Sequence, residues 1–122
     1  MNSIIWICQI LLAVMFLYSG ICKSFYSEQQ LIAKGQTGVV GQPVAVIRLA
    51  GISEVLGAVG IVLPWLLKVL PFLTPVSAIG FAVIMLFAAP IHYRLREKRN
   101  IAVNLTLMVT SLLVAWWRWR QL

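Results

Sequence analysis

Acidic residues are scarce in this chain. Three Asp and Glu residues stand against ten Lys and Arg, and charged residues make up only 11% of the 122 positions. Soluble domains carry about a quarter charged residues, so this composition does not fit a soluble fold. With so few carboxylates the chain also offers no carboxylate pair for general acid–base chemistry.

Other chemical groups are equally sparse. The two cysteines, Cys8 and Cys22, lie in one apolar run, and on a helix their separation is roughly 21 Å, too far for a disulfide. No Cys-x-x-Cys motif, nucleophile–base pair or glycine-rich phosphate loop is present, and the single histidine has no companions for a metal site. We therefore expect no metal and no autonomous catalytic centre.

What the chain has in excess is apolar sequence: 61% of its residues are hydrophobic. Four apolar runs, at about 4–22, 46–67, 73–91 and 101–117, each approach the ~20 residues that a helix needs to cross the hydrocarbon of a bilayer. The sequence predicts an all-α protein, an integral membrane antiparallel four-helix bundle that forms a single membrane domain over residues 1–122.

The only long connection joins the first two spans. Ser27 and Gln30 form a capping-box pattern, and Gly35 is a plausible helix stop, so a short helix is expected between them. Its apolar side, which includes Leu31, indicates that it lies at the membrane interface.

The distribution of cations predicts the orientation. The first and third loops place seven cations on one side: Lys23, Lys34, Arg48, Arg94, Arg96, Lys98 and Arg99. The opposite side, with both termini, carries three, namely Lys68, Arg118 and Arg120, and all five tryptophans. The positive-inside rule therefore places both termini outside the cytoplasm. The same pattern favours membrane lipid, not nucleic acid, as the partner of the cations.

Five polar residues are candidates for ligand binding. Lys23 ends the first span, Arg48 and Glu54 lie early in the second, His92 ends the third and Asn104 begins the fourth. In an antiparallel bundle these positions converge at one end, and Glu54 is the deepest, about 12 Å into its helix. Ionisable groups are costly inside a membrane, so each is a functional hypothesis.

A structural explanation competes for each candidate. The helical neighbours of Glu54 are all small, namely Ala50, Gly51, Gly57 and Ala58, which predicts close packing against another helix. A pair of Glu54 with Lys23 or Arg48 would then serve only to hold the helices together. Arg48 can snorkel to the interface, His92 can be an ordinary loop-edge residue, and Asn104 can hydrogen-bond between helices.

The segments Phe16–Lys23 and Arg48–Ala58 resemble the Phe-x-x-x-Gly-x-x-Lys and Gly-x-x-Glu-x-x-Gly-Ala patterns of the DoxX-like membrane proteins. Leu73–Pro75, Met85 and His92 fit the third span of that family, so the resemblance covers nearly the whole chain. It implies a four-helix membrane bundle, in which Lys23, Glu54 and His92 belong to the typical pattern. It also implies a bacterial cytoplasmic membrane, where relatives accompany redox or quinone-stress systems or assist the assembly of other membrane proteins.

Three functions follow as hypotheses. The first is an accessory or binding subunit, at most part of an oxidoreductase, that holds a quinone-like or lipidic molecule among Lys23, Arg48, Glu54, His92 and Asn104. The second is a structural or assembly partner of another membrane protein, or a homodimer held by small residues. The third is a small proton-coupled transporter based on Glu54.

Overall fold

A computed structural model describes all 122 residues and contains helices but no strand. The four long helices are α1 (Asn2–Phe25), α3 (Val44–Leu67), α4 (Leu73–Arg94) and α5 (Lys98–Arg120), and each is long and apolar enough to cross a membrane. The predicted all-α membrane bundle is therefore confirmed. Most helix ends extend beyond the predicted spans by a few residues, because a helix continues into the polar interface after the hydrocarbon ends.

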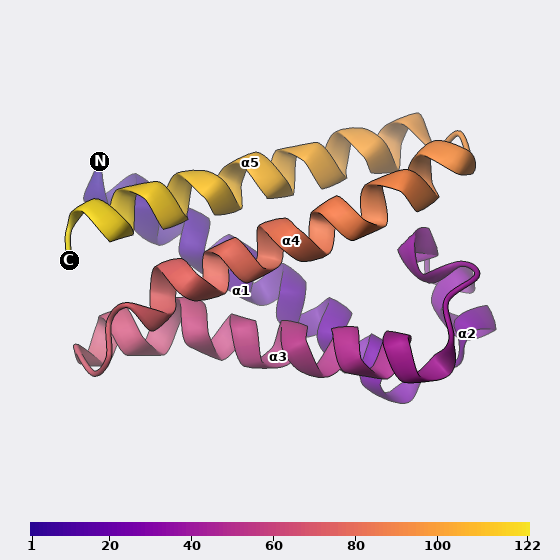
Figure 1. Cartoon of the computed structure of the whole chain (residues 1–122), viewed down its shortest axis with the longest axis horizontal. Helices are drawn as coiled ribbons and strands as arrows, with labels where there is room; N and C mark the ends of the chain where they lie inside the picture. The colour runs from indigo at the N-terminus through magenta and orange to yellow at the C-terminus, as the bar shows by residue number, and fades with distance from the viewer.

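The helices form a bundle in which successive long helices run in opposite directions (Figure 1). α1 packs mainly on α3, α4 packs on both α3 and α5, and α1 touches α5 only lightly. Both termini and the α3–α4 turn lie at one end, which we call the terminal end (Figure 1). The α1–α3 connection and the α4–α5 turn lie at the other end, which we call the loop end (Figure 1).

The α1–α3 connection contains the predicted short helix, α2 (Glu28–Ala33), and a single 3₁₀ turn, η1 (Thr37–Val39). The capping box of Ser27 and Gln30 is present in both directions, and Gly35 follows α2 with φ 84°. That conformation is left-handed and suits glycine, which explains why α2 stops there. Leu31 of α2 is fully buried against Val39 and neighbouring side chains, so the connection is anchored to the bundle.

Pro64 lies inside a helix, although its position in the sequence indicates a turn. In the sequence, Pro64 and Pro71 flank the segment between the second and third apolar runs, which favours a turn bracketed by the two prolines. In the structure Pro64 lies inside α3, which continues to Leu67. A proline nitrogen cannot donate to the carbonyl four residues earlier, here that of Gly60. The hydroxyl of Thr74 on α4 donates to that carbonyl at 3.4 Å. A neighbouring helix thus compensates for the missing bond, as is usual for membrane helices.

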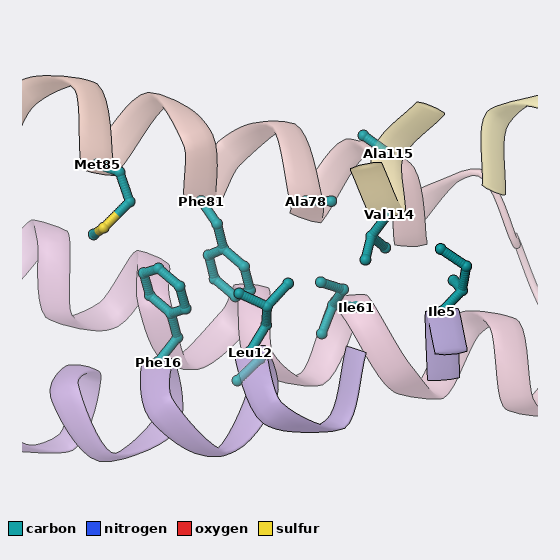
Figure 2. Close-up of a cluster of buried hydrophobic side chains, with 10 residues drawn as sticks. Ile5, Leu12, Phe16, Ile61, Ala78, Phe81, Met85, Val114 and Ala115 are labelled. Atoms are coloured by element: carbon teal, nitrogen blue, oxygen red, sulfur yellow. The ribbon is translucent and has the colours of Figure 1, made fainter. Parts of the chain in front are cut away.

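The core lies inside the bundle, where the side chains of the four long helices point toward one another (Figure 2). It extends from the middle towards the terminal end, because it includes Ile5 near the start of α1 and Ala115 near the end of α5. Its central feature is the stack of the Phe16 ring from α1 on the Phe81 ring from α4, with centroids 3.9 Å apart and planes inclined by 4°. Gly57 on α3 lies against the Phe81 ring, where a larger residue would collide with it. These apolar side chains fill the middle of the bundle, and the polar side chains of the candidate site lie at the loop end.

Candidate functional site

The deepest polar group is the Glu54 carboxylate, which is completely buried on α3. The Lys23 ammonium of α1 lies 2.7 Å from Glu54 Oε1, and the Ser19 hydroxyl donates to Oε2 at 3.0 Å. Both carboxylate oxygens are therefore satisfied, and the charge has a cationic partner. Of the two partners that the sequence allowed, the structure selects Lys23.

Close packing of α1 on α3 brings these two charges together. Gly20 on α1 lies against Gly51 on α3, and a Cβ on Gly20 would come within 2.7 Å of the Gly51 carbonyl oxygen. Gly51 in turn would place a Cβ 2.8 Å from the Gly20 oxygen. Backbone touches backbone here, as the small residues around Glu54 indicated. The short distance between the helix axes is what lets Lys23 reach Glu54.

Arg48 plays a different part. Its guanidinium Nη1 donates to the Lys23 carbonyl at 2.7 Å and to the Tyr26 carbonyl at 2.5 Å. The Lys23 oxygen lies in the last turn of α1 and the Tyr26 oxygen at its C-cap, where carbonyls have no partner within the helix. Arg48 therefore caps α1 from α3. Its guanidinium meets the candidate Lys23 only at the backbone carbonyl, and it makes no hydrogen bond with Glu54, His92 or Asn104.

His92 belongs to a separate polar cluster at the loop end. Its Nδ1 lies 3.0 Å from Glu97 Oε1, and the same carboxylate oxygen accepts a 2.6 Å hydrogen bond from the Thr37 hydroxyl of η1. Asn100 of α5 donates to the Thr37 oxygen at 3.3 Å. Hydrogen bonds from His92 and then Thr37 lower the pKa of Glu97 below its ordinary value. This cluster fastens η1 to the α4–α5 turn.

Asn104 is buried on α5 and donates its amide to the Met85 carbonyl of α4 at 2.8 Å. That contact is the helix–helix hydrogen bond that the sequence offered as its structural explanation. An Asn amide group has two hydrogens, so one donor remains for another acceptor.

A polar cavity of about 180 Å³ lies between these groups at the loop end. Lys23, His92 and Asn104 all line it, whereas Glu54 and Arg48 do not. The structure thus brings three of the five candidates to one cavity, and Glu54 is connected to it through its ion pair with Lys23. Gln36, the residue before η1, also lines the cavity, and its buried amide nitrogen has no hydrogen-bond partner.

A larger apolar groove of about 450 Å³ lies beside the polar cavity. Lys23, Gly38 and Ala88 line both spaces. The other groove residues come from α3, α4 and the segment before α3, and most are apolar: Val39, Gln42, Val46, Ile47, Leu49, Ala50, Ser53, Ile84, Phe87 and Ile91. Polar and apolar spaces therefore adjoin at the loop end, with the Lys23 side chain in the wall of each.

Sequence reasoning missed Gln36, Thr37, Glu97 and Asn100 as members of this region. Glu97 carried a signal, because it is one of only three acidic residues in the chain. The other three are ordinary polar residues in or near connections, and nothing in their spacing shows that η1 folds back onto the α4–α5 turn.

Comparison with known proteins gives one match. The family model described as the DoxX-like family matches residues 7–114, a region that includes all four long helices in whole or large part. No curated protein and no solved structure matches the chain significantly. Since the family match covers most of the sequence and the bundle is that of a four-span membrane protein, this chain is an integral membrane protein that belongs to the DoxX-like family.

Proposed function

We propose that this protein is an accessory or binding subunit that holds a quinone-like or lipidic small molecule at the loop end of the bundle. The ligand head occupies the polar cavity, and its apolar part lies in the adjoining groove. A link to a membrane redox system belongs to the same proposal, with the protein as a ligand-holding subunit.

The observation that carries the proposal is the unpartnered amide nitrogen of Gln36 in the wall of the polar cavity. Buried donors nearly always have an acceptor, so a ligand oxygen is the natural partner. Two other residues that line the same space carry further donors. The Lys23 ammonium has three hydrogens, of which Glu54 takes one, and Asn104 keeps one amide hydrogen free. A head group rich in acceptor oxygens, such as a quinone ring, fits this set.

The sizes of the two spaces support an amphiphilic ligand. The polar cavity, at about 180 Å³, is smaller than the ~300–1,000 Å³ typical of ligand pockets, whereas the groove, at about 450 Å³, lies within that range. Head and tail together would use both spaces, meeting beside Lys23, Gly38 and Ala88.

Titration with a short-chain ubiquinone, followed by native mass spectrometry in mild detergent, tests this function. Gln36→Leu removes the unpartnered donor and is expected to weaken quinone binding about tenfold, the equivalent of one hydrogen bond of ~1.4 kcal/mol. Gln29→Leu is the matched control, because Gln29 is exposed on α2 and lines neither space. Equal binding by wild type and Gln36→Leu would contradict the assignment of the head group to the polar cavity.

A second pair of variants tests the groove. Ala88→Phe places a ring between the two spaces and is expected to abolish quinone binding, whereas Val83→Phe adds the same ring on the exposed side of α4. If Ala88→Phe retained full affinity, the ligand would have to lie elsewhere.

Assembly of another membrane protein is the second candidate function. It is favoured by the contacts of Glu54, because each of its carboxylate oxygens already accepts a hydrogen bond, one from Lys23 and one from Ser19. Both partners belong to α1, so these bonds hold α1 and α3 together and leave Glu54 no role in ligand binding. A wild-type protein that binds no quinone would redirect the search to such partners. Proton-coupled transport is the weakest candidate, because Glu54 lines neither the cavity nor the groove.

The location that goes with this proposal is the bacterial cytoplasmic membrane with both termini outside the cytoplasm. The excess of cations at the loop end supports this orientation. The ligand would then reach the bundle from the cytoplasmic half of the bilayer.

A further inference from the structure

A second buried polar group lies at the terminal end, far from the proposed ligand. Arg118 in the last turn of α5 is only 1% exposed, although it is a charged residue. Its Nε donates to Gln9 Oε1 at 2.7 Å, and its Nη1 donates to Asn2 Oδ1 at 2.6 Å and to Gln121 Oε1 at 2.7 Å. Every one of these acceptors is a neutral amide oxygen.

The remaining nitrogen, Nη2, is buried and has no hydrogen-bond partner. Trp65 and Trp6 lie 4.5 Å and 5.3 Å from the guanidinium carbon and attract the charge by cation–π interaction. A ring over the face of the guanidinium does not accept the in-plane hydrogens of Nη2, which still require an oxygen. Two donors of a buried cation are therefore left without an acceptor.

No carboxylate side chain is available at this end. The three acidic residues are Glu28, Glu54 and Glu97, and all three lie in the half of the molecule that includes the loop end. The cations of the terminal end are Lys68, Arg118 and Arg120, and no acidic side chain lies among them. A buried charge is normally paired, and Arg118 forms no ion pair with any group of the chain, so an external anion is the natural partner.

We propose that Arg118 is the centre of an anion site that takes a phosphate oxygen. Phosphate suits a planar guanidinium, which can donate two parallel hydrogen bonds to it. Gln121 and Asn2 are exposed and uncharged, so either amide oxygen can be displaced by an anion that reaches Arg118 from the membrane surface. The site lies at the end that holds all five tryptophans, the residues that mark the head-group level of a bilayer. A phospholipid head group and a free phosphate share this chemistry.

The full-length protein in dodecyl maltoside, stripped of lipid, is titrated with phosphatidylglycerol, with diacylglycerol and with inorganic phosphate, and adducts are counted by native mass spectrometry. Wild type is expected to bind phosphatidylglycerol about tenfold more tightly than diacylglycerol, as one charge-assisted contact predicts. Displacement of the lipid by millimolar inorganic phosphate would identify a free-anion site, and failure to displace it would identify a head-group site. Either result supports an anion at Arg118. Equal affinity for the two lipids, with no phosphate adduct, overturns the proposal.

Gln121→Glu distinguishes this site from general attraction to a basic surface, and it does not require removal of the buried arginine. The introduced carboxylate supplies the missing anion, so we expect about tenfold weaker phosphatidylglycerol binding together with a higher thermal midpoint without lipid. Arg120→Gln is the control, because it changes the net charge by the same amount on an exposed neighbour that contacts Trp116 and Trp117. Equal losses of lipid binding in the two variants would overturn the assignment to Arg118.

Discussion

At the scale of single residues, buried charge is what distinguishes this bundle from a purely apolar one. Glu54 and Lys23 form the one ion pair between membrane helices, with side-chain exposures of 0% and 13%. Removing water from two charges is costly, and the cost is recovered only while both partners are present. The loss of one partner therefore costs more stability here than it would in an exposed ion pair.

Glu54→Gln is expected to destabilise the bundle by about 3 kcal/mol, because it leaves the Lys23 ammonium buried without a counter-charge. The double variant Lys23→Met with Glu54→Leu is expected to recover most of that loss, because no charge remains buried. Unfolding by sodium dodecyl sulfate in mixed micelles measures both. Glu28→Gln, which removes a carboxylate at the start of α2, should cost only about 0.5 kcal/mol. A Glu54→Gln protein as stable as wild type would contradict the role of the pair.

The lowered pKa of Glu97 predicts that the contact between η1 and the α4–α5 turn weakens at acidic pH. Its folded pKa lies below the ordinary value because His92 and Thr37 hydrogen-bond to the carboxylate. The ionised form is favoured in the folded state, so the stabilisation is fully present above the ordinary pKa and is lost as the pH falls through the lowered folded pKa. The Val40 amide donates to the Thr37 carbonyl, so its protection factor, the intrinsic exchange rate at each pH divided by the observed rate, should fall at acidic pH in wild type. In Glu97→Gln the protection factor should be lower already at neutral pH and should fall less on acidification.

At the scale of elements, glycine contacts decide how closely the helices approach. Gly20 and Gly51 bring the backbones of α1 and α3 together, and this is the contact that places Lys23 beside Glu54. Gly80 on α4 is different, because a Cβ there would meet nothing within 4 Å. The three glycines share a residue type but differ in what surrounds them.

Gly51→Ala is expected to lower stability by about 1–3 kcal/mol, because the added methyl group would meet the Gly20 carbonyl and the Lys23 backbone and force the helices apart. Gly80→Ala adds the same methyl group in open space and should leave stability unchanged or slightly higher. The same micelle unfolding assay compares them. Equal effects from the two substitutions would show that helix propensity, not the α1–α3 contact, determines the outcome.

At the scale of the whole molecule, the two ends differ in chemistry. The loop end holds the polar cavity, the ion pair and the Glu97 cluster, whereas the terminal end holds the tryptophans and buried Arg118. The middle is closed by the stack of Phe16 on Phe81. Packed apolar side chains therefore separate the polar cavity from the terminal end.

The orientation that the cations predict can be tested on the intact protein in cells. A fusion of alkaline phosphatase to the C-terminus should be active and a fusion of green fluorescent protein should be dark, since both report a terminus outside the cytoplasm. Replacing the cations of the α4–α5 turn, Arg94, Arg96, Lys98 and Arg99, by glutamine should shift part of the population to the inverted orientation. A fluorescent C-terminal fusion in wild type would contradict the predicted orientation.

The sequence by itself determined the four helices, their alternating directions and the end at which the polar residues gather. Those features depend on local composition, because the bilayer requires every backbone polar group to be satisfied within a segment of about 20 apolar residues. The capping box of α2 is also local, since its two side chains lie within one turn of the chain. The small residues one turn before and after Glu54 are a local signal of the same kind, because they mark a helix face that can pack closely.

Only the tertiary structure decided which polar groups meet. It paired Glu54 with Lys23, turned Arg48 to the end of α1, folded Gln36 and η1 over the cavity and enclosed Arg118 between tryptophans. These contacts join residues from different helices, and hydropathy leaves the rotation of each helix about its axis undetermined. Close packing at Gly20, Gly51 and Gly57 fixes that rotation, and with it the chemistry of both ends.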